Sequence, residues 1–228
     1  MREQPNTRWW LVPVLALVST GVTAQTISLP SPRTSGDVPV ESAIQQRQSV
    51  RRFSDEALTL AEAGQLLWAA SGSTVDGVSG PTRAAASAGG LYPVASYLVA
   101  EQVDGLEPGV YRYRWGSHEL ETVRSGSRLG QLHRAALLQG AVRRAPAVIV
   151  IAADYEVTER RYGERGTERY VHMDAGHAAQ NVHLQATALE LGSVPIGAFS
   201  DRQVRRTLGI DLTPLYIIPV GTPAAQHR

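Results

Sequence analysis

The chain has 228 residues, with 22 basic and 21 acidic side chains that give a formal net charge of +1, and it contains no cysteine. A charge this close to zero argues against nucleic acid as a partner, because phosphate-binding surfaces carry a clear basic excess. The lack of cysteine excludes disulfides, thiolate metal sites and cysteine nucleophiles, and because lysine is also absent, arginine is the strong cationic ligand that remains.

The first 24 residues have the pattern of a secretory signal peptide. Arg2 and Arg8 precede an apolar run, and small residues at 22–24 form a cleavage site before Gln25. The apolar run is about ten residues long, whereas a helix that spans a bilayer needs roughly twenty. We therefore expect export to the periplasm or the medium, with no stable membrane insertion if the signal is cleaved. A signal that is kept as an anchor is the alternative.

The composition divides the rest of the chain into three parts. Residues 25–39 are rich in Pro and Ser and are predicted to be a linker. Residues 40–223 are predicted to form one domain, which is large enough to bury a core of its own. Residues 224–228 would then be a short C-terminal tail.

Two helices are predicted at the start of this domain. Apolar residues at helical spacing favour a short helix over residues 40–48. Thr59 and Glu62 have the spacing of a capping box, which indicates the start of a second helix that Gly72 ends. The segment 71–90 is rich in glycine and small residues and is predicted to be a long loop, a feature that is commonly functional in compact domains.

Strands and helices alternate over the remainder of the domain. Strands are predicted over residues 97–103, 110–115, 119–123, 147–153 and 215–220, and helices over residues 127–139, 168–191 and 200–208. The run 147–153 is continuously apolar, which is typical of a strand that is covered on both faces. Gly192 ends the longest helix, and Ser200 with Gln203 caps the last one. Because hairpins and helices occur together, the predicted fold class is α+β.

The stretch RQSVRRF, residues 47–53, is the first candidate binding element. Guanidinium groups match the geometry of a phosphate, and a hydroxyl group adds a further donor. Arg47, Ser49 and Arg51 would therefore suit a phosphate ligand. A solvated basic surface is the alternative interpretation, and this stretch alone does not decide between the two.

Two further stretches contain little side-chain bulk. ASAGGLYP, residues 86–93, would expose backbone N–H groups that can lie against a flat ligand. SVPIGAFSD, residues 193–201, would expose the N–H group of Gly197 in the same way. Both stretches are also consistent with structural turns that need a glycine.

Three histidines lie on the predicted long helix, but they do not form a metal site. His172, His177 and His183 are separated by five and six residues, which places them on different faces of a helix. For His177 we expect packing of the helix with a hydrogen bond. No metal site is predicted.

Taken together, these stretches resemble the nitroreductase superfamily and, within it, the SagB/ThcOx-type dehydrogenase branch. RQSVRRF is similar to the Arg-x-Ser-x-Arg-x-Phe element for flavin phosphate, and ASAGGLYP to the Pro-Ser-Ala-Gly loop, with Ala86 in place of the usual Pro. The sequence MDAGHAAQNVHLQATALELGSVPIGAFSD is similar to the central helix and its following turn, and YIIPVGTP to the closing strand. The similarity covers residues 40–223.

The resemblance implies an FMN-binding nitroreductase-like fold, in which helices flank a mixed central sheet, and a homodimer with the flavin at the subunit interface. The residues that it assigns to the cofactor are Arg47, Ser49, Arg51, Ser87, Ala88, Gly89, Ile196 and Gly197. The first three would hold the 5′-phosphate. Gly197 would direct its N–H group at flavin N5, where hydride arrives and leaves.

The resemblance also points to two candidate catalytic residues. RRYGERG, residues 160–166, is similar to a Lys-Tyr-Gly segment of the branch that is implicated in the oxidation of peptide azolines. Arg161 stands in place of the lysine and Tyr162 is retained. Because arginine does not act as a base near neutral pH, we expect no role in peptide maturation. Tyr162 would donate a proton or pack through its ring.

The function that follows is that of an exported FMN-dependent oxidoreductase. Such an enzyme would transfer hydride through flavin N5 to or from a small organic substrate, for example a nitroaromatic compound, a quinone or another conjugated molecule. NAD(P)H is one candidate electron donor. The alternative is a flavin-binding or flavin-sequestering protein without catalysis, a reading that the change at Arg161 favours.

Overall fold

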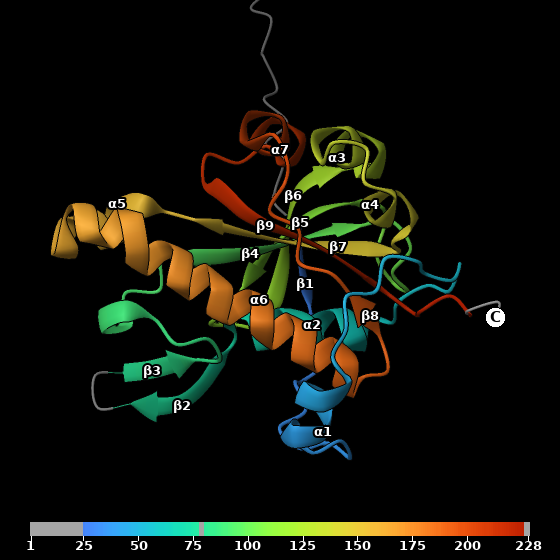
Figure 1. The fold of residues 1–228 in the computed structure, drawn as a ribbon, viewed down its shortest axis with the longest axis horizontal. Coiled ribbons are helices and arrows are strands. Elements are labelled where there is room, and N and C mark those ends of the chain that lie inside the picture. The colour runs from blue at the N-terminus through green and yellow to red at the C-terminus, as the bar shows by residue number, and fades with distance from the viewer. Residues whose placement is uncertain (1–24, 78–79, 226–228) are drawn as a thin grey trace, which may run out of the picture.

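The computed structural model describes residues 25–77 and 80–225 (Figure 1). The predicted signal peptide, residues 1–24, lies outside the described residues. Within the described part of the chain, none of the helices combines the length and the apolar character that are needed to cross a membrane.

Seven helices and nine strands make up the described structure. The helices are α1 (Val40–Gln46), α2 (Leu60–Ser71), α3 (Leu129–Ala135), α4 (Gly140–Arg144), α5 (Tyr155–Tyr162), α6 (Val171–Ala188) and α7 (Asp201–Leu208). The strands are β1 (Thr26–Ser28), β2 (Ser73–Gly77), β3 (Gly80–Arg83), β4 (Val94–Ala100), β5 (Gly109–Arg114), β6 (Glu119–Ser125), β7 (Ala147–Ala153), β8 (Gly192–Ser193) and β9 (Thr213–Gly221). A 3₁₀ turn covers Ala88–Gly90, and a π-helical turn covers Gly166–Tyr170.

A seven-stranded sheet in the order β1-β6-β5-β4-β7-β9-β8 forms the centre of the molecule. Its neighbouring strands pair in antiparallel fashion. Parallel pairing occurs in isolated bridges, which join Ser49 to Ser193 and Leu58 to Val103. The sheet with its helices gives the predicted α+β class.

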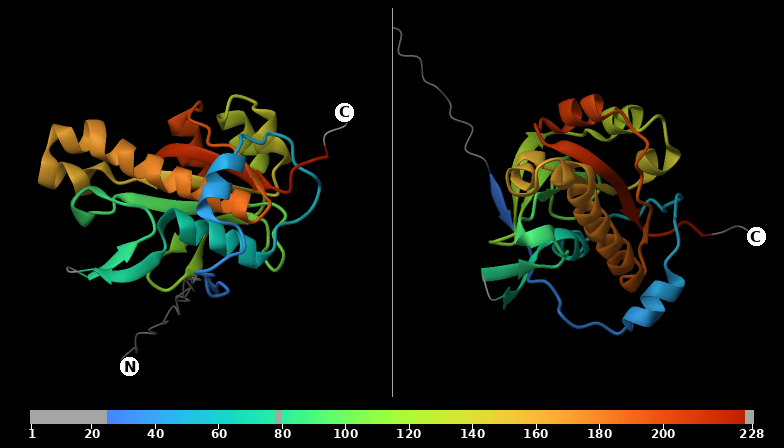
Figure 2. Two further views of the ribbon diagram at one scale, coloured as in Figure 1. Left: turned by 60° about the horizontal axis from the view of Figure 1, so that its bottom comes forward. Right: turned by 60° about the vertical axis from the view of Figure 1, so that its left-hand side comes forward.

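Helices cover both faces of the sheet, so that it has two hydrophobic cores (Figures 1 and 2). On β7, Ile149 and Ile151 pack into the core that includes α2 and α6, whereas Val148 and Val150 pack into the core beneath α3, α4 and α7. All seven residues of β7 are buried, which confirms the prediction that this strand is covered on both faces. The alternation follows from the two-residue period of a strand.

The predicted capping box is present at the start of α2. The Thr59 side chain accepts a hydrogen bond from the Glu62 N–H group at 3.2 Å, and the Glu62 carboxylate accepts one from the Thr59 N–H group at 2.8 Å. Two N–H groups of the first turn are thereby satisfied, and such a cap stabilises a helix by about 1 kcal/mol. At Ser200, by contrast, the predicted side-chain cap of α7 is not formed.

The long helix is shorter than predicted at its C-terminal end. Instead of running to Leu191, α6 ends at Ala188, and Glu190 adopts a left-handed conformation with φ of 59°. The reversal that was expected at Gly192 therefore occurs two residues earlier at a non-glycine residue. The predicted start at Glu168 lies inside the π-helical turn that leads into α6.

The structure differs from the predicted elements in three places. The predicted loop over residues 71–90 contains the antiparallel hairpin of β2 and β3, in which the Thr74 and Thr82 hydroxyl groups are 2.9 Å apart. The predicted helix over residues 127–139 ends at Ala135 as α3, because Leu137 and Leu138 have positive φ angles, and α4, which follows from residue 140, was not predicted. Helix α5 was not predicted, since its charged sequence offers little apolar periodicity.

The predicted linker over residues 25–39 contributes to the sheet. Within it, β1 pairs with β6 through the partners Thr26 and Glu121, Ile27 and Leu120, and Ser28 and Glu119. Leu29 follows as a buried core residue. The N-terminal part of this segment is therefore held by the domain.

Candidate functional site

The stretch RQSVRRF begins at the end of α1 and runs along the short strand β8. Ser49 forms a parallel bridge with Ser193, and the Val50 N–H group donates to the Ser193 carbonyl at 3.0 Å. Gly192 permits this close approach, because a Cβ atom there would lie 2.6 Å from the Val50 side chain. The arginine stretch is therefore fixed to the sheet by its backbone, which leaves its side chains available.

The arginines of this stretch have no acidic partners in the described part of the chain. The salt bridges found there involve Arg114, Arg160 and Arg205. Arg51 is exposed and Arg47 is partly buried. A cavity of about 280 Å³ lies against the stretch, lined by residues 48–52, Pro223 and Ala224. Guanidinium groups without carboxylate neighbours create a positive potential that suits an anion.

The Arg47 side chain forms a hydrogen bond with His183 of α6. The Arg47 Nη1 atom lies 3.0 Å from His183 Nε2, and His183 Nδ1 lies 2.6 Å from the Ser193 Oγ atom. Burial lowers the pKa of the His183 imidazole from its ordinary value, and the nearby Arg47 charge lowers it further. No local sequence pattern indicates this contact, because Arg47 and His183 are far apart in the chain.

The small-residue loop is held at the other end of α6 by Asp174. The Asp174 carboxylate is buried and accepts hydrogen bonds from the Ser87 hydroxyl at 2.5 Å and from the Ala88 N–H group at 3.2 Å. The Ser87 Oγ atom in turn accepts a bond from the Tyr92 N–H group at 2.8 Å. The Ser87 hydroxyl is therefore satisfied by hydrogen bonds inside the protein. Its role toward a ligand would be to fix the position of the loop.

Two more side chains of α6 bind the same loop. His177 Nδ1 lies 3.0 Å from the Ala86 carbonyl, and the Asn181 amide donates to the Ala84 carbonyl at 3.0 Å. Spacings of three and four residues put Asp174, His177 and Asn181 on one face of the helix. The bond that was expected for His177 is present, whereas the roles of Asp174 and Asn181 were not predicted.

Gly89 lies beside the two candidate catalytic residues. It has a φ angle of 61°, and a Cβ atom there would collide with the Tyr162 hydroxyl group and come within 3.5 Å of the Arg161 guanidinium carbon. The Tyr162 ring packs edge-on against Tyr170 at 5.0 Å between centroids, and the Arg161 guanidinium lies 5.6 Å from the Tyr162 ring centre. Glycine is needed here both for its conformation and for its lack of bulk.

The turn at Gly197 is open to solvent. Ile196 is buried and pairs with Ile217 of β9 through two backbone hydrogen bonds, whereas Gly197 is exposed. Among the described residues, no hydrogen-bond partner is found for the Gly197 N–H group, and nothing lies within 4 Å of a Cβ built there. This amide is therefore free to donate to a ligand.

The predicted site residues form two groups along α6. Arg47, Ser49, Arg51, Ile196 and Gly197 belong to segments that adjoin β8 and β9. Ser87, Ala88 and Gly89, with Arg161 and Tyr162, lie near the N-terminal part of α6, where Asp174 holds the loop. The anchoring residues of the two groups, Asp174 and His183, are nine positions apart, which is about 14 Å along a helix.

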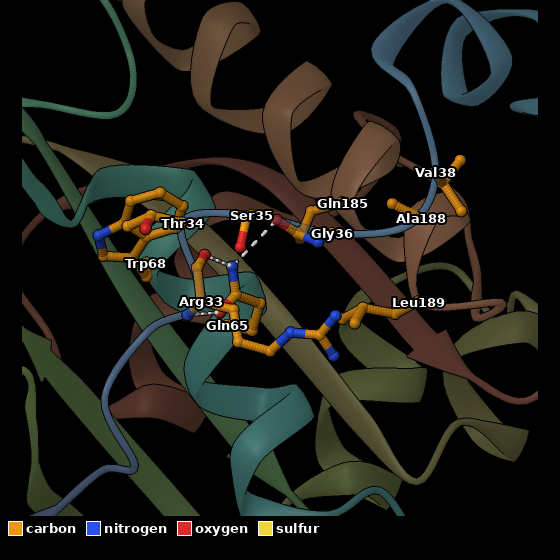
Figure 3. Close-up of a pocket in the computed structure, with 10 residues that line it drawn as sticks. All are labelled: Arg33, Thr34, Ser35, Gly36, Val38, Gln65, Trp68, Gln185, Ala188 and Leu189. Atoms are coloured by element: carbon orange, nitrogen blue, oxygen red, sulfur yellow. Dashed lines mark hydrogen bonds between the residues drawn. The ribbon is translucent and has the colours of Figure 1, made fainter.

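A separate cavity of about 200 Å³ lies between residues 33–38, α2 and the C-terminal end of α6 (Figure 3). Three of its residues are hydrogen-bonded to one another. The buried Gln65 side chain binds both the N–H and the carbonyl group of Arg33, at 2.8 and 3.0 Å, and also the Gln185 side chain at 3.1 Å. These contacts fasten the N-terminal segment to the helices, so we assign the polar groups of this cavity a structural role.

Comparison with known proteins gives sequence relatives over most of the chain. The model of the nitroreductase family matches residues 44–222. A Methanocaldococcus jannaschii protein that is provisionally named a nitroreductase is 42% identical over 185 residues, which are 81% of this chain and 91% of that protein. The trifolitoxin operon protein TfxC of Rhizobium leguminosarum is 28% identical over 130 residues, which are 56% of this chain and 36% of that protein.

Solved structures with the same fold carry related names. Nitroreductases named provisionally from Anabaena variabilis and Ralstonia eutropha both have a TM-score of 0.74, with 31% and 26% identity. The Anabaena match covers 88% of this chain but 42% of the other, and the Ralstonia match covers 98% and 99%. A Desulfovibrio desulfuricans structure in complex with FMN has a TM-score of 0.57 at 24% identity and covers 84% of this chain and 92% of its own, a level that shows the fold.

Proposed function

The chain belongs to the nitroreductase family, and we propose from this premise that it is an exported FMN-dependent oxidoreductase that transfers hydride through flavin N5 to or from a small organic substrate. The family membership supports an oxidoreductase. The complex of a structural neighbour with FMN supports the choice of this cofactor. FMN, when bound, would supply the redox chemistry, and the protein would supply binding, orientation and electrostatics.

The residues of the chain fit such a cofactor. Arg47 and Arg51 would bind the 5′-phosphate, since neither has an acidic partner in the described structure. The unpaired N–H group of Gly197 is the observation that carries the proposal, because a donor at flavin N5 stabilises the electron-rich reduced ring. Loop residues 87–89, held by Asp174, would line the ring.

We also propose a homodimer in which each flavin lies at the subunit interface. The two groups of site residues lie apart along α6 in one chain, with anchoring residues about 14 Å from each other. In a dimer, the arginines that bind the phosphate could come from one chain and loop 87–89 from its partner, so that both contact the same flavin. Tyr162 would stand at that loop as a proton donor.

The proposal extends to the SagB/ThcOx-type branch. The order of the motifs RQSVRRF, ASAGGLYP and RRYGERG supports it, and so does the identity of 28% with the trifolitoxin operon protein. Arg161 in place of the branch lysine makes azoline oxidation an unsuitable activity for this chain, because arginine is a poor general base near neutral pH. A small conjugated electron acceptor remains the proposed substrate class.

An absorbance spectrum of the purified protein tests this function. We expect flavin bands, present on purification or after FMN is added, that bleach when NADPH or NADH is supplied without oxygen. Bands that persist with both donors would favour another electron donor or the flavin-binding alternative without turnover. A protein that shows no bound flavin even with added FMN would contradict the proposal.

Export is tested separately by the intact mass of protein recovered from the exported fraction. We expect the mass of a chain that begins at Gln25, because the small residues at 22–24 form the predicted cleavage site. A mass that includes the first 24 residues would indicate an anchor instead. Protein that stays in the cytoplasm with an intact N-terminus would contradict export.

A further inference from the structure

His183 connects three elements that surround the arginine stretch. It lies on α6 with a side chain that is 4% exposed, and its ring reaches Arg47 at the end of α1 and Ser193 on β8. The same Ser193 bridges to Ser49 through the backbone. The ring is therefore fixed between the segment that carries Arg47 and the strand to which that segment is paired.

The two contacts define which nitrogen of His183 carries the proton. A guanidinium group is a donor only, so Nε2 must accept the hydrogen bond from Arg47 at 3.0 Å. The proton then resides on Nδ1, which donates to the Ser193 hydroxyl at 2.6 Å. His183 is accordingly neutral, in agreement with the direction in which burial and the Arg47 charge move its pKa.

This contact matters for Arg47 because a long side chain is otherwise free to adopt many rotamers. An arginine loses much of its side-chain entropy when it is ordered. His183 restricts the guanidinium before any ligand arrives and occupies only part of its donors, so that the others remain available. Preorganisation of this kind improves affinity by reducing the entropy that is lost on binding.

We infer that His183 is a positioning residue that holds the Arg47 guanidinium in the orientation in which it binds the 5′-phosphate of the flavin, an inference that rests on the proposed function. His183 acts through Arg47 and does not itself touch the ligand. Its contribution therefore concerns the phosphate, so it affects FMN binding and leaves riboflavin, which has no phosphate, unaffected.

Two substitutions separate the roles of the two ring nitrogens. His183→Gln places an amide oxygen near the position of Nε2 and can still accept from Arg47. His183→Asn is shorter, so that its amide can replace Nδ1 toward Ser193 but does not reach Arg47. Dissociation constants for FMN and for riboflavin, measured by quenching of flavin fluorescence, are compared for both variants and the wild type.

The expected difference lies in the ratio of the two dissociation constants. His183→Asn should weaken FMN binding about tenfold, the equivalent of one hydrogen bond to a charged group, with riboflavin binding unchanged. His183→Gln should keep the FMN preference within about twofold of the wild type. If His183→Asn does not fold, His183→Leu takes its place, because leucine also lacks an acceptor for Arg47.

The other possible results would contradict either the positioning role of His183 or the proposed function. Equal FMN preference in the Gln and Asn variants, or an equal loss of FMN and riboflavin affinity, would overturn the positioning role. A wild-type protein that binds neither FMN nor riboflavin would instead contradict the proposed function. A wild type that binds both equally well would show that the phosphate is not recognised, and the inference would fail with it.

The pH dependence of stability without flavin gives a second readout for the neutral ring. The folded-state pKa of His183 lies below its ordinary value of 6.5, so the unfolded chain takes up the proton first as the pH falls. The stability from the neutral ring is therefore present above about pH 6.5 and is lost as the pH falls through the folded-state pKa. In urea titrations, the wild type should lose more stability than His183→Gln between about pH 7 and about pH 5. Identical losses in the two proteins would contradict a neutral His183.

Discussion

Replacing both Arg47 and Arg51 by alanine is expected to give a folded protein that purifies without colour. Both side chains lack acidic partners in the described structure, so apart from the Arg47 contact with His183 at 3.0 Å, the anion that they would bind is the main interaction that is lost. A hydrogen bond to a charged group contributes about 1.5 to 3 kcal/mol, and the loss of two such bonds weakens FMN binding by a factor of about 100 or more. Absorbance after purification and FMN titration measure the effect.

Arg52→Ala provides the matched control for this double variant. Arg52 belongs to the same stretch and its side chain is exposed. Its carbonyl accepts a hydrogen bond from the Ala224 N–H group at 3.0 Å, and this backbone contact does not depend on the side chain. We expect flavin occupancy close to that of the wild type. Riboflavin affinity should be similar in all three proteins. Full flavin occupancy in the double variant would refute the assignment of the phosphate site.

The second large effect is expected for Asp174→Ala. The substitution removes a buried carboxylate and leaves the Ala88 N–H group without its partner, while the Ser87 hydroxyl loses its acceptor. Loss of these two bonds should lower the free energy of unfolding by about 3 kcal/mol. For a domain of this size, that corresponds to a fall in Tm of roughly 6 to 12 °C. Thermal unfolding followed by circular dichroism measures the change.

A double-mutant cycle with Ser87→Ala tests whether the loss comes from this contact. If Asp174 acts through Ser87, the two single substitutions should not add, and the coupling should be about 1 to 3 kcal/mol. Glu168→Ala removes an exposed carboxylate near the start of the same helix and should change stability by less than about 0.5 kcal/mol. A Tm for Asp174→Ala that equals that of the Glu168 control would show that the carboxylate does not secure the loop.

Local signals allowed much of the fold to be predicted. The capping box at Thr59 and Glu62 depends on residues within one turn of a helix, and the apolar run 147–153 reports burial without reference to any partner. The hairpin of β2 and β3 was missed for the opposite reason. Its strands have small and polar residues and are held by cross-strand pairing, including the contact of Thr74 with Thr82, which no local pattern reveals.

Sequence motifs point to the residues that are proposed to face a ligand, but they do not reveal the residues that support them. Arg47 and Gly89 stand out in sequence because charge and a lack of side chain are properties of single positions. Asp174 and His183 gain their roles from partners 87 and 136 residues away. Along the chain they are an acidic residue and a histidine on a helix, and only the packing of α6 against the loop and β8 shows what they bind.

The three-residue strand β1 also has a consequence for self-association. An edge strand presents unpaired backbone groups to solvent, and a long one can recruit strands from other molecules into aggregates. Without β1, the seven residues of β6 would form this edge. β1 covers the part of β6 from Glu119 to Glu121. It is itself short, and Pro30, two residues after it, has no N–H group to donate to a further strand. The segment at the N-terminal end of the domain thus protects the sheet against strand addition by neighbouring molecules.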